Sequence, residues 1–252
     1  MKFIILGSGS SMGVPRPDGF FGNCDPKNDK NFRSRCSALI KSKDKNVLID
    51  TSPDLRNQML RNKIKSLDTV MYTHYHADQT HGINDLRVFF LRRKKKIPVY
   101  TDRNTKKYLL DSFSYCFKGS KEYPPILRLF DIKKKFKIGK FINIETIKVR
   151  HGSINSVSYI INKKIAYLPD ANEIYKKDYQ KFFKLDFLII DCLRYEAHPS
   201  HFNLDDVLKM NIDLKPKKLI LTNLHSDLDY GKLINILPKN TKPAYDGLTL
   251  NF

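Results

Sequence analysis

The sequence predicts a mixed α/β protein whose sheets are covered by helices on their outer faces, and three observations support this. Short apolar segments rich in β-branched residues recur along the 252 residues, as expected for buried strands. Segments with helix-start signals lie between several of them. Charged residues fall mostly between the strands, which suits a layered fold. Because no linker or low-complexity segment interrupts the pattern, we expect residues 1–252 to form one domain.

The predicted strands are apolar runs, and those that fall within 126–168 follow one another closely, as hairpins do. Along the chain the strands are residues 2–6, 36–40, 46–50, 68–73, 141–149, 156–161, 164–168, 186–190 and 217–222.

The predicted helices lie at residues 53–62, 80–93, 103–112, 203–212 and 228–236. The first of them has a clear start: Ser52 suits an N-cap, Pro53 the first helical position and Asp54 the first turn. Asn203 precedes a periodic apolar face in the same way.

The net charge of +20 raises the question of a nucleic-acid partner. Lysine is scattered over the whole chain, however, and the densest basic run, residues 92–96, ends a helical segment. Nucleic acid therefore stays open as a partner but is not favoured, since a basic face attracts a small phosphorylated substrate equally well.

No stretch approaches the ~20 apolar residues that cross a bilayer, so no membrane partner is expected. The start of the chain, MKFIILGSGS, suits a first strand better than a signal peptide. The four cysteines form no C-x-x-C pair. We therefore expect reduced thiols and a cytoplasmic protein.

Ionisable residues stand at the ends of five predicted strands, and this is the most informative feature of the sequence. Asp50, His74, His151, Asp170 and His225 each end or follow such a strand. In α/β proteins the strand ends and the loops beyond them are where sites are built. We expect these residues to form a site.

Residues 73–82, THYHADQTHG, hold three of the seven histidines of the chain. Within them, His74 and His76 can face one metal ion from an extended turn, and Asp78 can reach a second ion beside it. Imidazole and carboxylate ligands suit Zn²⁺, Mn²⁺ or Fe²⁺. Ligands that converge from several segments favour an open, catalytic site over a closed structural one.

The segment THYHADQTHGINDLR resembles the signature T-H-x-H-x-D-H of the metallo-β-lactamase fold superfamily. GSGSSMGVPRP, VLIDTSPDLRNQML, VRHGS, AYLPDA, DCLRYEAHPSHF and PAYDGL together resemble the phosphoribosyl cyclic-phosphate phosphodiesterase group, which is related to the tRNA 3′-processing endonucleases. The resemblance runs from end to end of the chain. It implies a four-layer αββα sandwich with metals in a groove at one edge between the sheets.

The resemblance also implies a set of metal ligands. His74, His76 and His151 correspond to the ligands of a first ion, and Asp170 to the residue that bridges two ions. Asp78 and His225 would bind the second ion. Asp50 corresponds to a structural aspartate that supports the loop bearing the histidines.

The chain departs from the motif at three places. Gln79 stands where the family has a histidine, and Asn223 follows the threonine of the last motif, so that His225 is the expected replacement ligand. His81 is a less favoured substitute for the missing ligand. The family's cysteine-rich knuckle is reduced to residues 22–36, where we expect no metal. The resemblance thus implies one or two divalent ions, Zn²⁺ or Mn²⁺, with a weak second site.

For the chemistry, the resemblance implies attack on phosphorus by a metal-activated hydroxide. His201 is the expected general acid and Asp78 the second catalytic residue; His198 is a less favoured acid. The arginines considered as phosphate ligands are Arg33, Arg35 and Arg87.

The function expected on these grounds is a metal-dependent phosphodiesterase that cleaves a small phosphate ester, cyclic esters included. Two alternatives stay open: an RNA-processing nuclease, and a catalytically degraded binding or scaffold member of the family. The related enzymes are commonly dimers, so a homodimer stays open, but the sequence does not give the oligomeric state. The sequence fixes neither the physiological substrate nor the metal.

Overall fold

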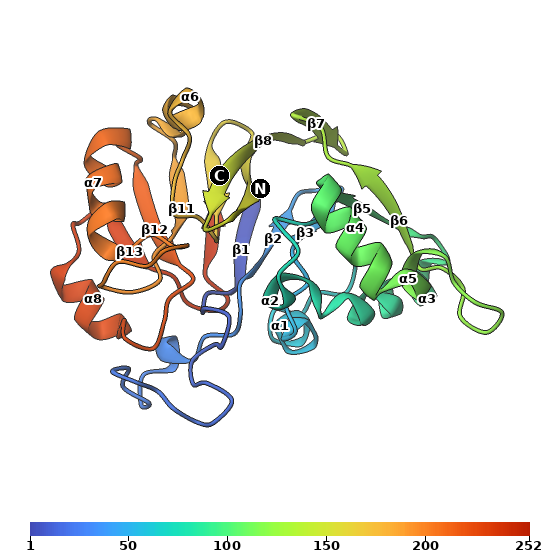
Figure 1. Cartoon of the computed structure of the whole chain (residues 1–252), viewed down its shortest axis with the longest axis horizontal. Coiled ribbons are helices and arrows are strands. Elements are labelled where there is room, and N and C mark those ends of the chain that lie inside the picture. The colour runs from blue at the N-terminus through green and yellow to red at the C-terminus, as the bar shows by residue number, and fades with distance from the viewer.

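A computed structural model describes residues 1–252 and contains two seven-stranded sheets that face each other, with helices on both outer faces (Figure 1). The predicted four-layer αββα sandwich is therefore confirmed. No helix has the length and apolar character needed to span a membrane.

The first sheet begins with antiparallel pairs and continues with parallel ones. β14, β1, β2 and β3 pair antiparallel in that order, and β4, β5 and β6 then add in parallel. Its strands are β1 (Lys2–Gly7), β2 (Ser37–Lys41), β3 (Asn46–Ile49), β4 (Thr69–Met71), β5 (Ile97–Thr101), β6 (Leu127–Asp131) and β14 (Thr249–Asn251).

The second sheet has four parallel strands, β13 to β10, followed by the antiparallel strands β9, β8 and β7. Its strands are β7 (Lys135–Ile138), β8 (Ile142–His151), β9 (Ile154–Ile161), β10 (Ile165–Leu168), β11 (Phe187–Asp191), β12 (Lys218–Thr222) and β13 (Thr241–Pro243).

The helices divide between the two outer layers according to their place in the chain. Helices of the first half pack on the first sheet and those of the second half on the other, as the colours of Figure 1 show. The α-helices are α1 (Leu55–Arg61), α2 (Ala77–Thr80), α3 (Arg87–Arg93), α4 (Arg103–Ser112), α5 (Ser114–Phe117), α6 (Lys176–Tyr179), α7 (Leu204–Leu214) and α8 (Tyr230–Ile236). The 3-10 helices are η1 (Asp29–Asn31), η2 (Ile83–Leu86) and η3 (Gln180–Phe182).

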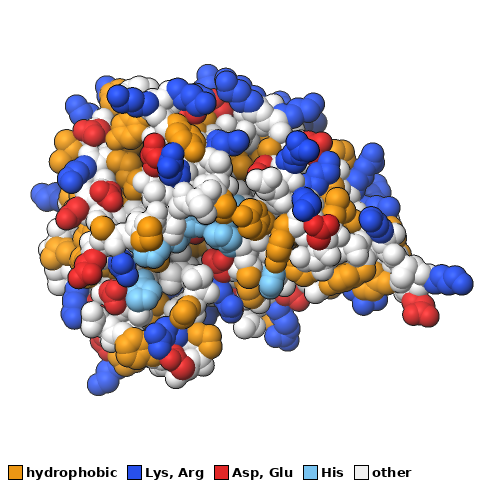
Figure 2. Space-filling model, viewed as in Figure 1, with side chains coloured by type: hydrophobic (Ala, Val, Ile, Leu, Met, Phe, Trp, Pro, Cys, Tyr) orange, Lys and Arg blue, Asp and Glu red, His pale blue; other side chains and the backbone are white.

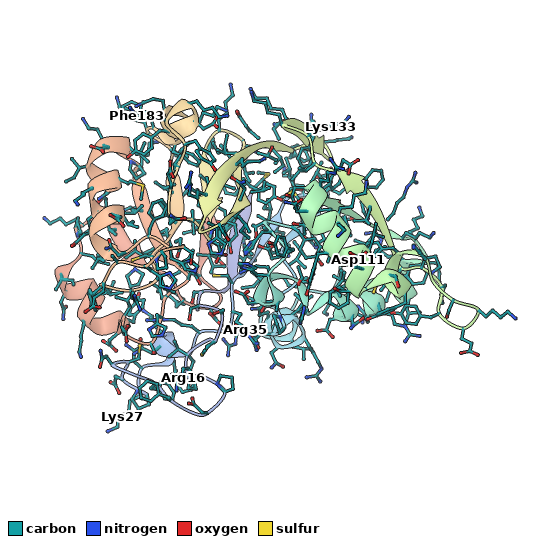
Figure 3. All side chains as sticks on the ribbon, in the orientation of Figure 1. Arg16, Lys27, Arg35, Asp111, Lys133 and Phe183 are labelled. Carbon is teal, nitrogen blue, oxygen red and sulfur yellow. The ribbon has the colours of Figure 1, made fainter.

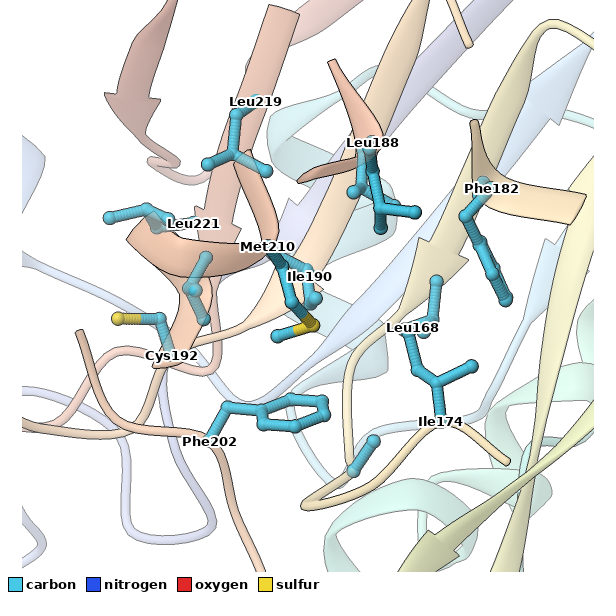
Figure 4. Close-up of a cluster of buried hydrophobic side chains, with 14 of the residues drawn as sticks. Leu168, Ile174, Phe182, Leu188, Ile190, Cys192, Phe202, Met210, Leu219 and Leu221 are labelled. Carbon is cyan, nitrogen blue, oxygen red and sulfur yellow. The ribbon is translucent and has the colours of Figure 1, made fainter. Parts of the chain in front are cut away.

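Three apolar clusters hold the four layers together: one between the sheets and one between each sheet and its helices. Figure 4 shows the cluster beneath α7, where Phe182, Leu188 and Met210 meet. The strands of the second sheet alternate between this cluster and the one between the sheets: Leu188 and Ile190 face α7, whereas Ile189 faces the other sheet. Strands buried on both faces explain why the sequence shows continuous apolar runs rather than alternation.

All nine predicted strands are present with small shifts at their ends. The sequence patterns gave no separate bounds for β5, β6, β7, β13 or β14. β5 contains Pro98, β13 and β14 are three residues long, and most residues of β6 and β7 are exposed or half-buried.

The prediction of one helix over residues 80–93 is wrong, because α2, η2 and α3 divide this stretch. The break lies at Gly82, where the chain passes so close to Ser52 that a Cβ would lie 2.0 Å from the Ser52 carbonyl oxygen. Asp54 rather than Ser52 is the residue before α1, although Ser52 Oγ accepts a hydrogen bond from the Asp54 N–H. At α7, Asn203 and Asp206 form a capping box, as its start predicted.

Candidate metal centre

The ionisable residues at the strand ends line one pocket at an edge of the sandwich or lie directly behind its lining. Asp50 follows β3, His74 follows β4, His151 ends β8 and Asp170 follows β10. Figure 2 shows several histidine side chains around a hollow on this face. The cavity has a volume of about 290 Å³ and is lined by Ser10, Ser11, Met12, His76, Asp78, His151, Asp170, Leu193, Arg194, His198, Ser200, His201, Asn223 and His225.

Three imidazoles point their ring nitrogens at one another at the centre of the pocket. His74 Nε2 lies 2.9 Å from His76 Nδ1, and His151 Nε2 lies 3.3 Å from the same atom. His74 and His151 are buried. Their rings meet edge to face, with centroids 4.5 to 5.0 Å apart, so the nitrogens rather than the ring faces converge.

Hydrogen bonds on the far side of two rings fix where their protons lie. His151 Nδ1 is 2.7 Å from the Ser200 carbonyl oxygen, which can only accept, so this nitrogen carries the hydrogen. His74 Nδ1 is 3.0 Å from Thr73 Oγ1, whose own hydrogen goes to Asp50 Oδ2 at 2.9 Å when Asp50 is ionised. Nε2 of both rings therefore presents a lone pair towards His76.

The electrostatics of the pocket keep these rings neutral. Burial, followed by repulsion from the neighbouring histidines, lowers the pKa of His74 well below its ordinary value. Burial and the charge of His201 lower the pKa of His151 to about 4. Burial also lowers the pKa of His76. Neutral imidazoles are the form that binds metal, so all three are ready ligands at neutral pH.

Buried carboxylates lie beside the imidazoles. Burial, and then the charge of Asp78, raise the pKa of Asp170 well above its ordinary range. Burial raises the pKa values of Asp78 and Asp191 as well. Carboxylates that are buried away from solvent are stabilised by a proton, a cation or a hydrogen-bond donor beside them.

Asp50 lies below the imidazoles and supports them through Thr73. Its Oδ1 accepts the Thr73 N–H at 2.7 Å and its Oδ2 the Thr73 hydroxyl at 2.9 Å. The chain turns sharply at this strand end, because Asp50 has a φ of 63°. Asn223, at the end of β12, has a φ of 61°, so two strand ends at the site use the left-handed region that Asp and Asn tolerate.

His201 is the one imidazole of the site that is held as a cation. Its Nδ1 lies 2.7 Å from Asp191 Oδ2 and 3.9 Å from Asp170 Oδ1. Burial alone would lower the pKa of His201, but Asp191, followed by Asp170, outweighs burial and raises it to about 9. His201 is thus protonated at neutral pH, and Nδ1 is committed to Asp191, which leaves Nε2–H for the pocket.

The residues that can hold a metal form two overlapping groups. In His74, His76 and His151, and again in His151, Asp170 and His201, the ligand atoms all lie within 4.8 Å of one another. Three neutral imidazoles next to a buried carboxylate are a donor set that fits a divalent ion such as Zn²⁺ or Mn²⁺.

The structure leaves His225 outside both groups. His225 lines the pocket, but its Nδ1 lies 3.0 Å from Asp227 Oδ2. Asn223 takes the inner position instead and contacts Asp170 and Asp191. His81 points away from the ligands and bonds the Tyr108 hydroxyl at 2.9 Å. His198 lies at the rim, 3.2 Å from Ser200 Oγ.

The three arginines considered as phosphate ligands have other roles. Arg33 is buried and donates to the carbonyl oxygens of the loop 225–228. Arg35, labelled in Figure 3, is paired with Asp54 at 2.7 Å. Arg87 lies over the Tyr123 ring. The arginine that does line the pocket is Arg194, within the segment DCLRYEAHPSHF, and nothing in its spacing distinguishes it from the others.

The four cysteines are free and buried, and Cys24 and Cys36 form no metal group. Burial raises the pKa of Cys36 well above its ordinary value, and that of Cys116 to about 11. Neutral buried thiols are poor nucleophiles. The chemistry of the site therefore rests on imidazole and carboxylate.

A family profile described as the beta-lactamase superfamily domain matches residues 45–223 of the chain, which include every strand end that carries a predicted ligand except His225. A protein of Porphyromonas gingivalis named octanoyltransferase is 32% identical over 256 residues, covering 98% of this chain and 51% of that protein. The chain thus spans about half the length of this relative.

Solved structures agree with the fold. A crystal structure described as a new diphosphatase from the PhnP family is 30% identical, with a TM-score of 0.89, and the match covers 100% of this chain and 97% of that one. Zn²⁺-bound PqqB from Methylobacterium extorquens has a TM-score of 0.80 at 15% identity, with both chains fully covered. The short form of human tRNase Z has a TM-score of 0.72 at 14% identity, covering 100% and 99%. The last two show the fold alone.

Proposed function

This chain belongs to the metallo-β-lactamase superfamily, a superfamily of hydrolases, and from that premise we propose that it is a metal-dependent phosphodiesterase acting on a small phosphate ester. The observation that carries the proposal is the convergence of three neutral imidazoles, His74, His76 and His151, beside a cationic His201. Such a pairing supplies a cation site and a proton donor in one pocket.

Metal binding would fall to the three imidazoles, with the carboxyl group of Asp170 beside them. The chemistry that a divalent ion supplies in such a centre is the acidification of water and the neutralisation of charge on phosphoryl oxygens. Asp50 and Thr73 keep His74 in the tautomer that binds, and Ser200 does the same for His151.

The leaving oxygen of a cleaved ester needs a proton, and His201 is placed to give it. Asp191 holds Nδ1 and orients the ring, so that Nε2–H faces the pocket. Arg194 uses part of its guanidinium for the carbonyl oxygens of Glu196 and Ala197, and its remaining N–H groups are free for a phosphate. A positioned acid typically contributes about 10²- to 10⁴-fold to a rate.

The pocket suits a polar ester better than a long acyl chain. Only Met12 and Leu193 among its lining residues are apolar, and the cavity of about 290 Å³ is bounded by histidines and carboxylates. The similarity to a structure described as a diphosphatase supports phosphate chemistry. The name octanoyltransferase belongs to a protein about twice as long, so it does not weigh against this proposal.

The test is hydrolysis of bis(p-nitrophenyl) phosphate by the purified protein with Mn²⁺ or Zn²⁺. We expect turnover that is lost in His74→Ala and His151→Ala and kept in His81→Ala, since His81 is a histidine of the same segment that points away from the ligands. Absence of turnover with every divalent metal, in protein shown to be folded, would refute the proposal. Cleavage of a tRNA precursor without cleavage of small diesters would favour a nuclease instead.

A further inference from the structure

Two buried carboxamides, Gln79 and Asn223, lie among the carboxylates at the floor of the pocket. Gln79 Nε2 is 3.1 Å from Asp78 Oδ2 and also 3.1 Å from Asp170 Oδ2. Asn223 Nδ2 is 3.3 Å from Asp170 Oδ1 and 3.0 Å from Asp191 Oδ1. Each amide nitrogen therefore bridges two carboxylates, and both oxygens of Asp170 receive an amide hydrogen.

An amide nitrogen is a donor without a lone pair to give to a metal. Placed between two carboxylates, its two hydrogens offset the same negative charge that a bridging cation would offset. The assignment of nitrogen rather than oxygen follows from the surroundings, since an amide oxygen facing two carboxylates would be repelled.

In this position between Asp78 and Asp170, the amide of Gln79 has hydrogen-bond partners at its nitrogen but none at its oxygen. Its Oε1 is buried and has no partner, a condition that typically costs about 1–3 kcal/mol. A glutamine whose only role was to fill space would be expected to satisfy both ends. The Nε2 of Gln79 instead lies within hydrogen-bond distance of both Asp78 and Asp170.

We propose that this chain binds a single divalent ion, held by His74, His76 and His151, and that Gln79 and Asn223 occupy the second cation position of the pocket with amide hydrogens. This inference rests on the proposed metal centre.

The test is metal stoichiometry rather than activity. Protein purified without chelators and dialysed to equilibrium against Mn²⁺ is analysed for ions per chain by inductively coupled plasma mass spectrometry, and its Mn²⁺ electron paramagnetic resonance spectrum is recorded. We expect one ion per wild-type chain, with the hyperfine lines of an isolated ion. In the double variant Gln79→His, Asn223→His we expect two ions and an exchange-coupled spectrum.

Histidine is tolerated at the left-handed φ of Asn223, so the double variant does not conflict with the backbone there. Gln79→Glu is a second variant, nearly the same in shape, that turns the amide nitrogen into an oxygen ligand; it too should bind a second ion. Gln180→His, which adds an imidazole on the exposed surface, controls for a general gain of metal affinity and should stay at one ion.

The outcomes separate the two proposals. Two ions in the wild-type chain would overturn the single-ion inference and leave the proposed hydrolase standing. One ion in the wild type and one in both the double variant and Gln79→Glu would also overturn it, because the amides would not be what excludes the second ion. No ion in the wild type would remove the metal centre and, with it, both proposals.

Discussion

Replacing Asp50 by asparagine should weaken metal binding without removing a single ligand. Asn has the same shape as Asp and tolerates the φ of 63° at this position, so the change acts on hydrogen bonds alone. The Thr73 N–H, 2.7 Å away, can only donate, so the amide oxygen must face it. The amide nitrogen then faces Thr73 Oγ1, where a carboxylate oxygen now accepts.

The exchange of an acceptor for a donor at residue 50 changes the next hydrogen bonds, from Thr73 to His74. With a donor on one side, the Thr73 hydroxyl turns its hydrogen towards His74 Nδ1, 3.0 Å away, and that nitrogen must accept. The proton of His74 moves to Nε2, the atom that faces His76, and the lone pair for the metal is lost. Disturbing a partner of this kind typically costs about 10- to 100-fold in metal affinity, which corresponds to roughly 1.4–2.7 kcal/mol.

The assay is competition for Zn²⁺ or Mn²⁺ against a fluorescent chelator, with urea unfolding measured alongside. Asp68→Asn is the matched control, because Asp68 also accepts a backbone N–H, from Asn46 at 2.9 Å, but lies at the opposite end of β4. It should lose stability and keep its metal affinity. A metal dissociation constant in Asp50→Asn within twofold of the wild-type value would refute the relay.

Three further outcomes are expected. The variant His201→Gln should keep its metal and lose about 10²- to 10⁴-fold in turnover of an alkyl phosphodiester. The loss for a p-nitrophenyl ester should be much smaller, because its leaving group needs no acid. Equal losses on both substrates would contradict the role of His201 as the acid. Burial raises the pKa of Asp54, but the ion pair with Arg35 outweighs burial and lowers this pKa below its usual range. The pair therefore stabilises the fold above a pH of about 4, the ordinary pKa of an aspartate. This contribution is lost as the pH falls through the lower pKa that Asp54 has in the folded state. Urea unfolding of Asp54→Asn should therefore differ from wild type at pH 7 and converge with it in acid, and a constant difference would show that the pair does not titrate. Phe182→Ala, in the cluster beneath α7, should cost about 3–5 kcal/mol by urea unfolding, and a loss below about 1 kcal/mol would mean that the site collapses around the gap.

Most of the fold was accessible from the sequence because its strands are buried on both faces. Such strands are continuous apolar runs bounded by polar turns, and all nine that the pattern predicted exist. β5, β13 and β14 were not predicted because a proline or a short length removes that pattern, and β6 and β7 because most of their residues are exposed or half-buried. The helix predicted over 80–93 failed for a tertiary reason: the close approach of Gly82 to Ser52 breaks a stretch whose local pattern is helical.

The sequence by itself determined which residue types reach the pocket, since the ends of neighbouring strands must meet at the same edge of a sheet. His74, His151 and Asp170 follow from that rule. Only the tertiary structure decided between side chains on one loop. The left-handed turn at Asn223 directs its amide to Asp170 and Asp191 and leaves His225 against Asp227. A turn angle and the partner that awaits each side chain are properties of the packed chain, and residue spacing does not carry them.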